Sequence, residues 1–211
     1  MHRFGAVFCK RVVPFFPRNF VEETKGNWMT ALVVEDLDRS SQTRMFTFLG
    51  VDYFSTPKAW VSLPITILVG IIIALLFAPD EQLQSQIISG IGYGFIIMIS
   101  SFCHGVGHIL SSRLVNAPVT YIIETATVYV TQYDDKVDQS SRVHLIRALG
   151  GPVFNLLLGT IAITIYQIAL PNHFLLFFGI VNLGIGVFTL LPIPTLDGAV
   201  IWHELRNWNS A

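Results

Sequence analysis

Three long stretches of this sequence contain no Asp, Glu, Lys or Arg. They comprise 21 residues between Lys58 and Asp80, 31 residues between Glu81 and Arg113, and 49 residues between Arg147 and Asp197. A helix that crosses a bilayer needs about 20 predominantly apolar residues, so each of the first two stretches predicts one spanning helix. The third stretch is too long for a single helix. Pro171 and Asn172 offer a break there, because proline ends a helix and asparagine favours a turn.

The predicted spanning helices lie near residues 61–78, 85–110, 147–170 and 174–191. We therefore expect an α-helical polytopic membrane protein with four transmembrane helices, for which the lipid bilayer is a partner. Composition agrees, since only 13% of the 211 residues are charged, against roughly 25% in soluble domains. The net charge of −1 argues against a nucleic-acid partner. Two cysteines, Cys9 and Cys103, are too few for a disulfide framework.

The positive charges predict how the helices are oriented in the membrane. All 13 Lys and Arg residues fall on one side of the predicted bundle: eight before the first helix, four in the connection between the second and third, and one after the last. Cytoplasmic loops carry the excess of Lys and Arg, so we expect four passes with both termini and the 111–146 loop in the cytoplasm. Residues 1–44 form a basic, aromatic segment that would lie at the cytoplasmic membrane face or form a poorly ordered tail.

The long cytoplasmic connection is richer in strand-forming residues than a linker. Residues 119–123 and 125–131 contain many β-branched and aromatic side chains, and the second run partly alternates. This composition is typical of β-strands, so we predict a small sheet or hairpin at the membrane edge.

Three ionisable side chains lie at membrane depth, where such groups are costly and are therefore candidates for a function. Their types and spacing make them candidates for a metal site. His104 and His108 are four residues apart, which places both imidazoles on one helix face. Asp197 follows two prolines in the segment LPIPTLDG, where an unwound helix end could present its carboxylate. Two histidines and a carboxylate make a zinc site with an open fourth position. Alternatively, the histidines bond to Ser100, Ser101 or a neighbouring helix, and Asp197 only caps the next segment.

The order of these motifs resembles the site-2 protease group of intramembrane zinc metalloproteases, peptidase family M50. That group has an HExxH helix, a later Gly-Pro…Asn motif and a helix end similar to NLLPIPPLDG. The corresponding residues here begin at His104, at Gly151-Pro152 with Asn155, and at Thr189. The resemblance implies a core with four transmembrane helices and a membrane-edge sheet over residues 45–203, followed by a short tail at 204–211. It also implies zinc ligands at His104, His108 and Asp197, with Gly151, Pro152 and Asn155 close to the site or to a bound substrate.

One departure from the family pattern bears on activity. Gly105 stands where the family has its catalytic Glu, which moves protons to and from the reacting groups and is worth about 10² to 10⁴ in rate. Thr189 and Thr195 also replace the family's Asn and Pro. We therefore expect no catalytic residue at the general-base position, and a pseudoprotease that serves as a scaffold, an accessory subunit of a membrane complex, or a binder of transmembrane segments.

Two other functions stay open. In the first, the chain is an active zinc protease that takes a base from Glu124, a substrate or a partner chain. In the second, His104 or His108 ligates a tetrapyrrole, because imidazole in an apolar helix suits an axial ligand.

Small and polar residues predict close helix contacts. Gly105 and Gly107 reduce the bulk of the histidine helix, and the GxxxG pair Gly90 and Gly94 suggests another close approach. Asn182 lies inside an apolar run and needs a hydrogen-bond partner there, either for function or as a plain interhelical bond.

Overall fold

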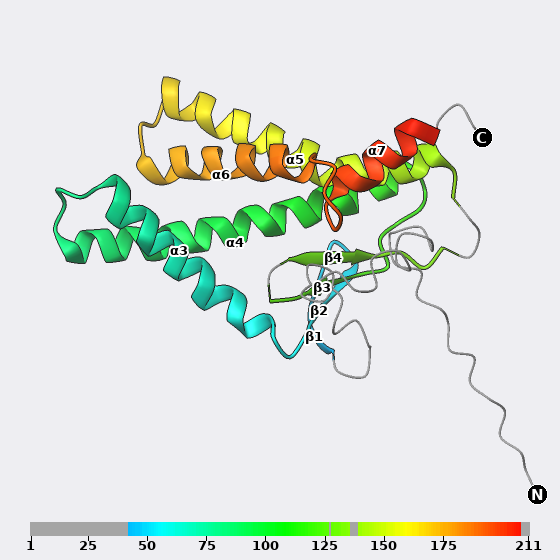
Figure 1. Cartoon of the computed structure of the whole chain (residues 1–211), viewed down its shortest axis with the longest axis horizontal. Coiled ribbons are helices and arrows are strands. Elements are labelled where there is room, and N and C mark those ends of the chain that lie inside the picture. The colour runs from blue at the N-terminus through cyan, green and yellow to red at the C-terminus, as the bar shows by residue number, and fades with distance from the viewer. Residues whose placement is uncertain (1–41, 127, 136–138, 208–211) are drawn as a thin grey trace, which may run out of the picture.

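The structure is a computed structural model, and it describes residues 42–126, 128–135 and 139–207. Most of the predicted N-terminal segment, 1–44, therefore lies outside the described residues. Its elements, in chain order, are β1 (Thr43–Phe48), β2 (Val51–Ser55), the short 3₁₀ helix η2 (Ala59–Val61), α3 (Ser62–Phe77), α4 (Leu83–Leu114), β3 (Tyr121–Glu124), β4 (Tyr129–Gln132), α5 (Ser141–Ile168), α6 (His173–Thr189) and α7 (Asp197–Asn207). Figure 1 shows a helical bundle with the sheet beside one end of it.

Four apolar helices lie where the charge-free stretches predict them, and they make this an integral membrane protein. Three spans among the described residues are long and apolar enough to cross a membrane: Ala59–Phe77, Leu83–Leu114 and Ser141–Ile168. The fourth helix, α6, is also apolar but has 17 residues, or about 26 Å of length. It begins where the break at Pro171 is predicted, because the side chain of Asn172 accepts hydrogen bonds from the amides of Phe174 and Leu175.

Helix α5 differs most from its predicted boundaries. It begins at Ser141, six residues before the predicted start near 147, and Pro152 lies inside it. Charge-free stretches mark the apolar part of a helix, whereas α5 extends into a polar region that contains Arg142 and Arg147. Helix α7 likewise continues to Asn207, across the expected boundary at 203.

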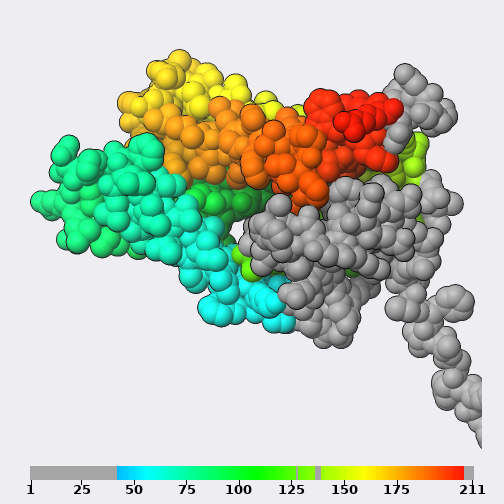
Figure 2. Space-filling view, viewed as in Figure 1, coloured from blue at the N-terminus to red at the C-terminus, as the bar shows by residue number. Residues whose placement is uncertain are grey.

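Glycines allow the helices to pack at close range, as the small residues predict. A Cβ atom added at Gly90 would lie 2.4 Å from Cα of Ile71, and one at Gly94 would lie 2.6 Å from Cα of Ile67. Real side chains do not come this close, so the crossing of α3 and α4 depends on these glycines. Helix α4 also packs against α5 and α6. Figure 2 shows a strip of α4, in green, below α6.

The four strands form one sheet in the order β1-β2-β3-β4. β1 and β2 form an antiparallel hairpin whose turn, Leu49-Gly50, has positive φ at both residues. β3 and β4 form a second antiparallel pair, and β2 and β3 join the two pairs in parallel. The predicted strand pair in the connection is therefore confirmed, but it is half of a larger sheet. One face of this sheet packs against α4, where Tyr53 and Ile122 bury Ile109.

Candidate metal centre

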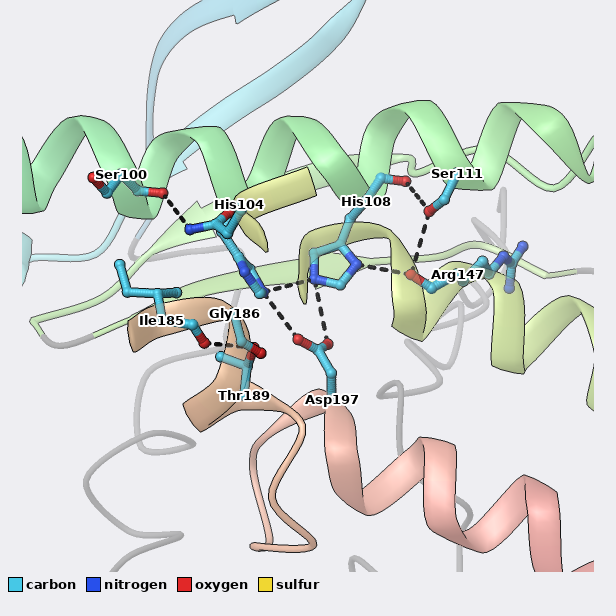
Figure 3. A network of polar contacts seen from close by, with 10 residues as sticks. Ser100, His104, His108, Ser111, Arg147, Ile185, Gly186, Thr189 and Asp197 are labelled. Carbon is cyan, nitrogen blue, oxygen red and sulfur yellow. Dashed lines mark hydrogen bonds and ion pairs between the residues drawn. The ribbon is translucent and has the colours of Figure 1, made fainter. Parts of the chain in front are cut away.

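The three candidate ligands come together from two helices that are far apart in sequence. His104 and His108 point from the same face of α4, and Asp197 is the first residue of α7. Nε2 of His104 lies 3.1 Å from Nε2 of His108 and 2.9 Å from Oδ2 of Asp197. Nε2 of His108 lies 3.3 Å from Oδ1 of Asp197. Figure 3 shows the two imidazoles side by side above the carboxylate.

The ligand atoms of these three side chains lie about as far apart as the ligand atoms around a single zinc ion. In a tetrahedral zinc site with bonds of 2.0 to 2.1 Å, ligand atoms lie about 3.3 to 3.4 Å apart. The observed separations are 3.1 Å between the two Nε2 atoms, 2.9 Å from Nε2 of His104 to Oδ2 of Asp197, and 3.3 Å from Nε2 of His108 to Oδ1 of the same carboxylate. Among the described residues, these are the His, Cys, Asp and Glu side chains that converge closely enough to hold one ion. Two nitrogens and one carboxylate oxygen fit zinc and leave its fourth position open.

Asp197 reaches the histidines because the chain leaves its helical path after α6. Residues 190–196 form turns between α6 and α7, and Thr195 has a φ of 82°. Proline is confined to φ near −65°, so this backbone excludes the proline that the family motif carries at this position. Gly198 is also required, because its added Cβ would lie 2.1 Å from the carbonyl oxygen of Leu191. The turn thereby directs the Asp197 carboxylate toward α4.

The electrostatic surroundings keep Asp197 ionised. Burial alone would raise the pKa of this carboxyl, but the facing imidazoles of His108 and His104 outweigh that effect. The pKa of Asp197 is therefore lowered below its ordinary value. An ionised carboxylate is the form that a metal ion needs.

A second layer of contacts orients His108. Its Nδ1 donates to the backbone carbonyl of Arg147 at 2.8 Å, so Nε2 is the ring nitrogen that faces Asp197 and would bind a metal ion. The Arg147 side chain is 1% exposed, and it donates to both carboxylate oxygens of Asp135 and to the carbonyl of Ala117. Its guanidinium also lies 4.1 Å from the centre of the Tyr133 ring. No sequence motif indicated this group of contacts around Arg147.

Gly151 closes the site from α5. A Cβ added there would lie 2.4 Å from Nε2 of His104 and 2.5 Å from Nε2 of His108. Pro152 follows it in the helix and is buried. Gly151 therefore lies against both candidate histidines.

Asn155 and Asn182 meet at Ser100, one turn before His104 on α4. Nδ2 of Asn155 donates to the Ser100 carbonyl at 3.2 Å, and Nδ2 of Asn182 donates to the Ser100 hydroxyl at 2.9 Å. Both asparagines are completely buried. No described hydrogen bond joins either serine to a histidine, and Ser101 donates to the carbonyl of Ile97. His108 instead bonds to the neighbouring helix α5, which the predicted alternative also allows.

Gly105 and Gly107 differ in what surrounds them. A Cβ at Gly107 would lie 2.4 Å from the Gly150 carbonyl, so α5 needs a glycine there. A Cβ at Gly105 would meet only Cδ1 of Ile122 at 3.6 Å and the hydroxyl oxygen of Tyr53 at 3.9 Å. These are ordinary contact distances, so packing near the backbone does not demand a glycine at 105. The expected close approach of a neighbouring helix is confirmed at Gly107, whereas no described helix comes as close to Gly105, where the expected approach of a ligand stays a prediction.

Glu124 has a structural partner away from the candidate ligands. It ends β3, and its Oε1 accepts a hydrogen bond from Ser62 at the start of α3 at 3.1 Å. It does not belong to the cluster formed by His104, His108 and Asp197 within the described part of the chain.

Comparison with known proteins identifies the fold. The structure of the site-2 protease from Methanocaldococcus jannaschii superimposes with a TM-score of 0.57 at 18% sequence identity, over 79% of this chain and 72% of that one. Comparisons with protein-family models and with curated protein sequences find no match. At this level of identity, the likeness shows a site-2-protease-like fold and no more. The expected fold class is confirmed.

Proposed function

We propose that this integral membrane protein holds a zinc ion through His104, His108 and Asp197, and binds transmembrane segments of other membrane proteins without cleaving them. One observation carries the proposal: three metal-ligating side chains converge, while the next residue after the first ligand, Gly105, has no side chain. Zinc, when bound, polarises a carbonyl oxygen as a Lewis acid. The protein would act as an accessory subunit or scaffold in a membrane complex.

The missing carboxylate is what argues against proteolysis. Hydrolysis of an amide needs a group that takes a proton from water and gives one to the leaving nitrogen. Asp197 faces both histidines and Glu124 is bonded to Ser62, so neither carboxylate is free for that task. An active protease with a non-standard base would need that base from a substrate, from a partner chain or from outside the described part of this chain.

The close contact with α5 favours a metal ion over a tetrapyrrole at the histidines. Gly151 lies against Nε2 of both imidazoles, where an added Cβ would come within 2.5 Å. A planar macrocycle bound axially to either nitrogen would need that space. A single ion within the triangle of ligand atoms does not.

The proposed topology has four passes, with both termini and the 111–146 loop in the cytoplasm. Three helices long enough to span and the shorter apolar helix α6 support the count. The placement of all 13 Lys and Arg residues on one side supports the orientation.

The test is purification from source membranes in mild detergent, with the polypeptides and zinc of the intact particle measured together. We expect zinc and a second membrane polypeptide in fixed stoichiometry with this chain. After reconstitution with the wild-type chain, the second polypeptide should stay uncleaved. Cleavage of that polypeptide by wild type, abolished by a chelator and by His104→Ala, would contradict the proposal. Gly105→Glu restores the missing base and Gly105→Gln is its uncharged control, so cleavage by the first variant alone would identify residue 105 as the cause of inactivity.

A further inference from the structure

Among the described residues, a buried hydroxyl group close to Gly105 of α4 lacks a hydrogen-bond partner. Tyr53 lies in the middle of β2, its side chain is 2% exposed, and among the described residues nothing bonds to its hydroxyl oxygen. Buried polar groups in native proteins nearly always have a partner, and an exception signals a bound water, ion or ligand. Sequence patterns gave no reason to select Tyr53.

The ring of Tyr53 is held in place by packing. It stacks on Phe46 with 4.6 Å between ring centroids and a 14° angle between planes. It also contacts Phe102 of α4, with 5.5 Å between ring centroids. Because the ring has aromatic neighbours on the sheet and on α4, its hydroxyl group is kept in a defined position.

The hydroxyl faces the space that a side chain at residue 105 would occupy. The Tyr53 oxygen lies 3.9 Å from the Cβ position of Gly105, and Ile122, the neighbour of Tyr53 across the parallel strands, lies 3.6 Å from it. Any side chain at 105 would begin between these two residues. With glycine there, no residue in the described part of the chain supplies an acceptor for this hydroxyl.

We propose that Tyr53 binds a carbonyl or carboxylate oxygen of a polypeptide held at the metal centre, by donating a hydrogen bond from its hydroxyl into the space above Gly105. This rests on the proposed function, because it requires an ion at His104, His108 and Asp197. Gly105 follows His104 directly in α4, so this space borders the turn of the helix that carries the first candidate ligand.

The hydroxyl group of Tyr53 is suited to donate a hydrogen bond rather than to act as a base. Burial raises the pKa of Tyr53 to about 12, so the hydroxyl keeps its proton at neutral pH. A donor of this kind holds a carbonyl oxygen but does not take a proton from water. It therefore supports binding of a peptide group without hydrolysis.

The test uses the full-length protein loaded with cobalt(II), whose visible absorption reports both metal binding and the arrival of a fourth ligand. Acetohydroxamate is the probe, because it presents carbonyl-type oxygens to the metal. Tyr53→Phe removes only the donor. Tyr121→Phe is the matched control, since Tyr121 is a buried tyrosine on the adjacent strand β3 whose ring packs on Phe54.

We expect equal cobalt loading in all three proteins and a probe affinity that falls about five- to tenfold in Tyr53→Phe alone, the factor for one neutral hydrogen bond. Equal probe affinity in Tyr53→Phe and wild type would overturn the role of Tyr53 and leave the proposed metal function standing. Failure of the wild type to bind cobalt would overturn both. The order of measurement, metal first and probe second, separates the two failures.

A second variant keeps the test decisive where Tyr53→Phe does not fold. Gly105→Gln fills the same space from α4 and leaves the phenol in place, with its amide oxygen available to the Tyr53 hydroxyl. We expect this variant to load cobalt and to bind acetohydroxamate more weakly than wild type. Unchanged probe binding would overturn the proposal.

Discussion

Nδ1 of His108 donates to the backbone carbonyl of Arg147 at 2.8 Å, and this bond links the candidate metal centre to the first turns of α5. The carbonyl belongs to the residue whose guanidinium is held by both oxygens of Asp135. Figure 3 shows the imidazole of His108 between Asp197 and this carbonyl. The orientation of one candidate ligand therefore depends on a residue of α5 whose side chain pairs with Asp135, in the connection that precedes this helix.

Asp135→Asn should destabilise the protein and weaken metal binding. The change leaves the buried guanidinium of Arg147 without its ionised partner. Because Arg147 is buried and Asp135 is partly exposed, we expect the free energy of unfolding to fall by about 2 to 4 kcal/mol. Thermal unfolding in detergent and cobalt titration measure the two effects. Asp134→Asn is the control, because that neighbour is exposed. Equal losses in the two variants would show that the ion pair with Arg147 does not support the site.

Gly151→Ala should weaken metal binding, whereas Gly105→Ala should leave it nearly unchanged. A Cβ at residue 151 would lie 2.4 Å from Nε2 of His104, so the imidazole must move and metal affinity should fall at least tenfold. At residue 105 the nearest atom is 3.6 Å away, so metal affinity should stay within twofold of wild type. Cobalt titration of both variants checks this. The same affinity for both would show that α5 does not close over the histidines.

Ser100 and Asn182 should be energetically coupled. Nδ2 of Asn182 donates to the Ser100 hydroxyl at 2.9 Å between two completely buried side chains. Interhelical hydrogen bonds in membrane proteins are worth about 0.6 kcal/mol on average and up to about 1.7 kcal/mol. A double-mutant cycle of Ser100→Ala and Asn182→Ala, followed by unfolding in detergent, should give a coupling energy within that range. Strictly additive effects would rule out a bond that contributes to stability.

Stability of the metal-free protein should fall as the pH decreases through the carboxyl range. The pKa of Asp197 is lowered in the folded protein, so near pH 4 and below the unfolded chain takes up this proton more readily than the folded chain. The stabilisation from the ionised carboxylate is present at neutral pH and is lost on acidification. Unfolding of wild type and Asp197→Asn from pH 7 to pH 3 measures this. A pH dependence that is unchanged in Asp197→Asn would assign it to other groups.

Local patterns predicted the helices well because lipid imposes a simple requirement on them. The bounds of α3, Ser62–Phe77, differ by one residue at each end from the predicted 61–78. α4 is longer than predicted, because its last turns leave the apolar region and carry Arg113. The parallel pairing of β2 with β3 was not predictable in this way, because the two strands are separated by two spanning helices and neither contains a pattern that selects the other.

Local sequence patterns predicted the candidate ligands of the site but not the residues around them. The i, i+4 spacing places His104 and His108 on one face, and the prolines before Asp197 indicate the turn that brings its carboxylate to them. Arg147 and Tyr53 were missed. Their roles arise from contacts with Asp135 and with the space above Gly105, and such contacts between distant segments leave no periodic signal in the sequence.

The most direct test of the proposed zinc centre is the zinc content of the protein purified in mild detergent without added metal. We predict one zinc ion per chain in the wild type, and its loss in Asp197→Ala, a variant whose folding is checked by circular dichroism. A folded wild-type protein that contains no zinc and takes up none when it is offered would contradict the account. So would a folded Asp197→Ala variant that retains the full zinc content.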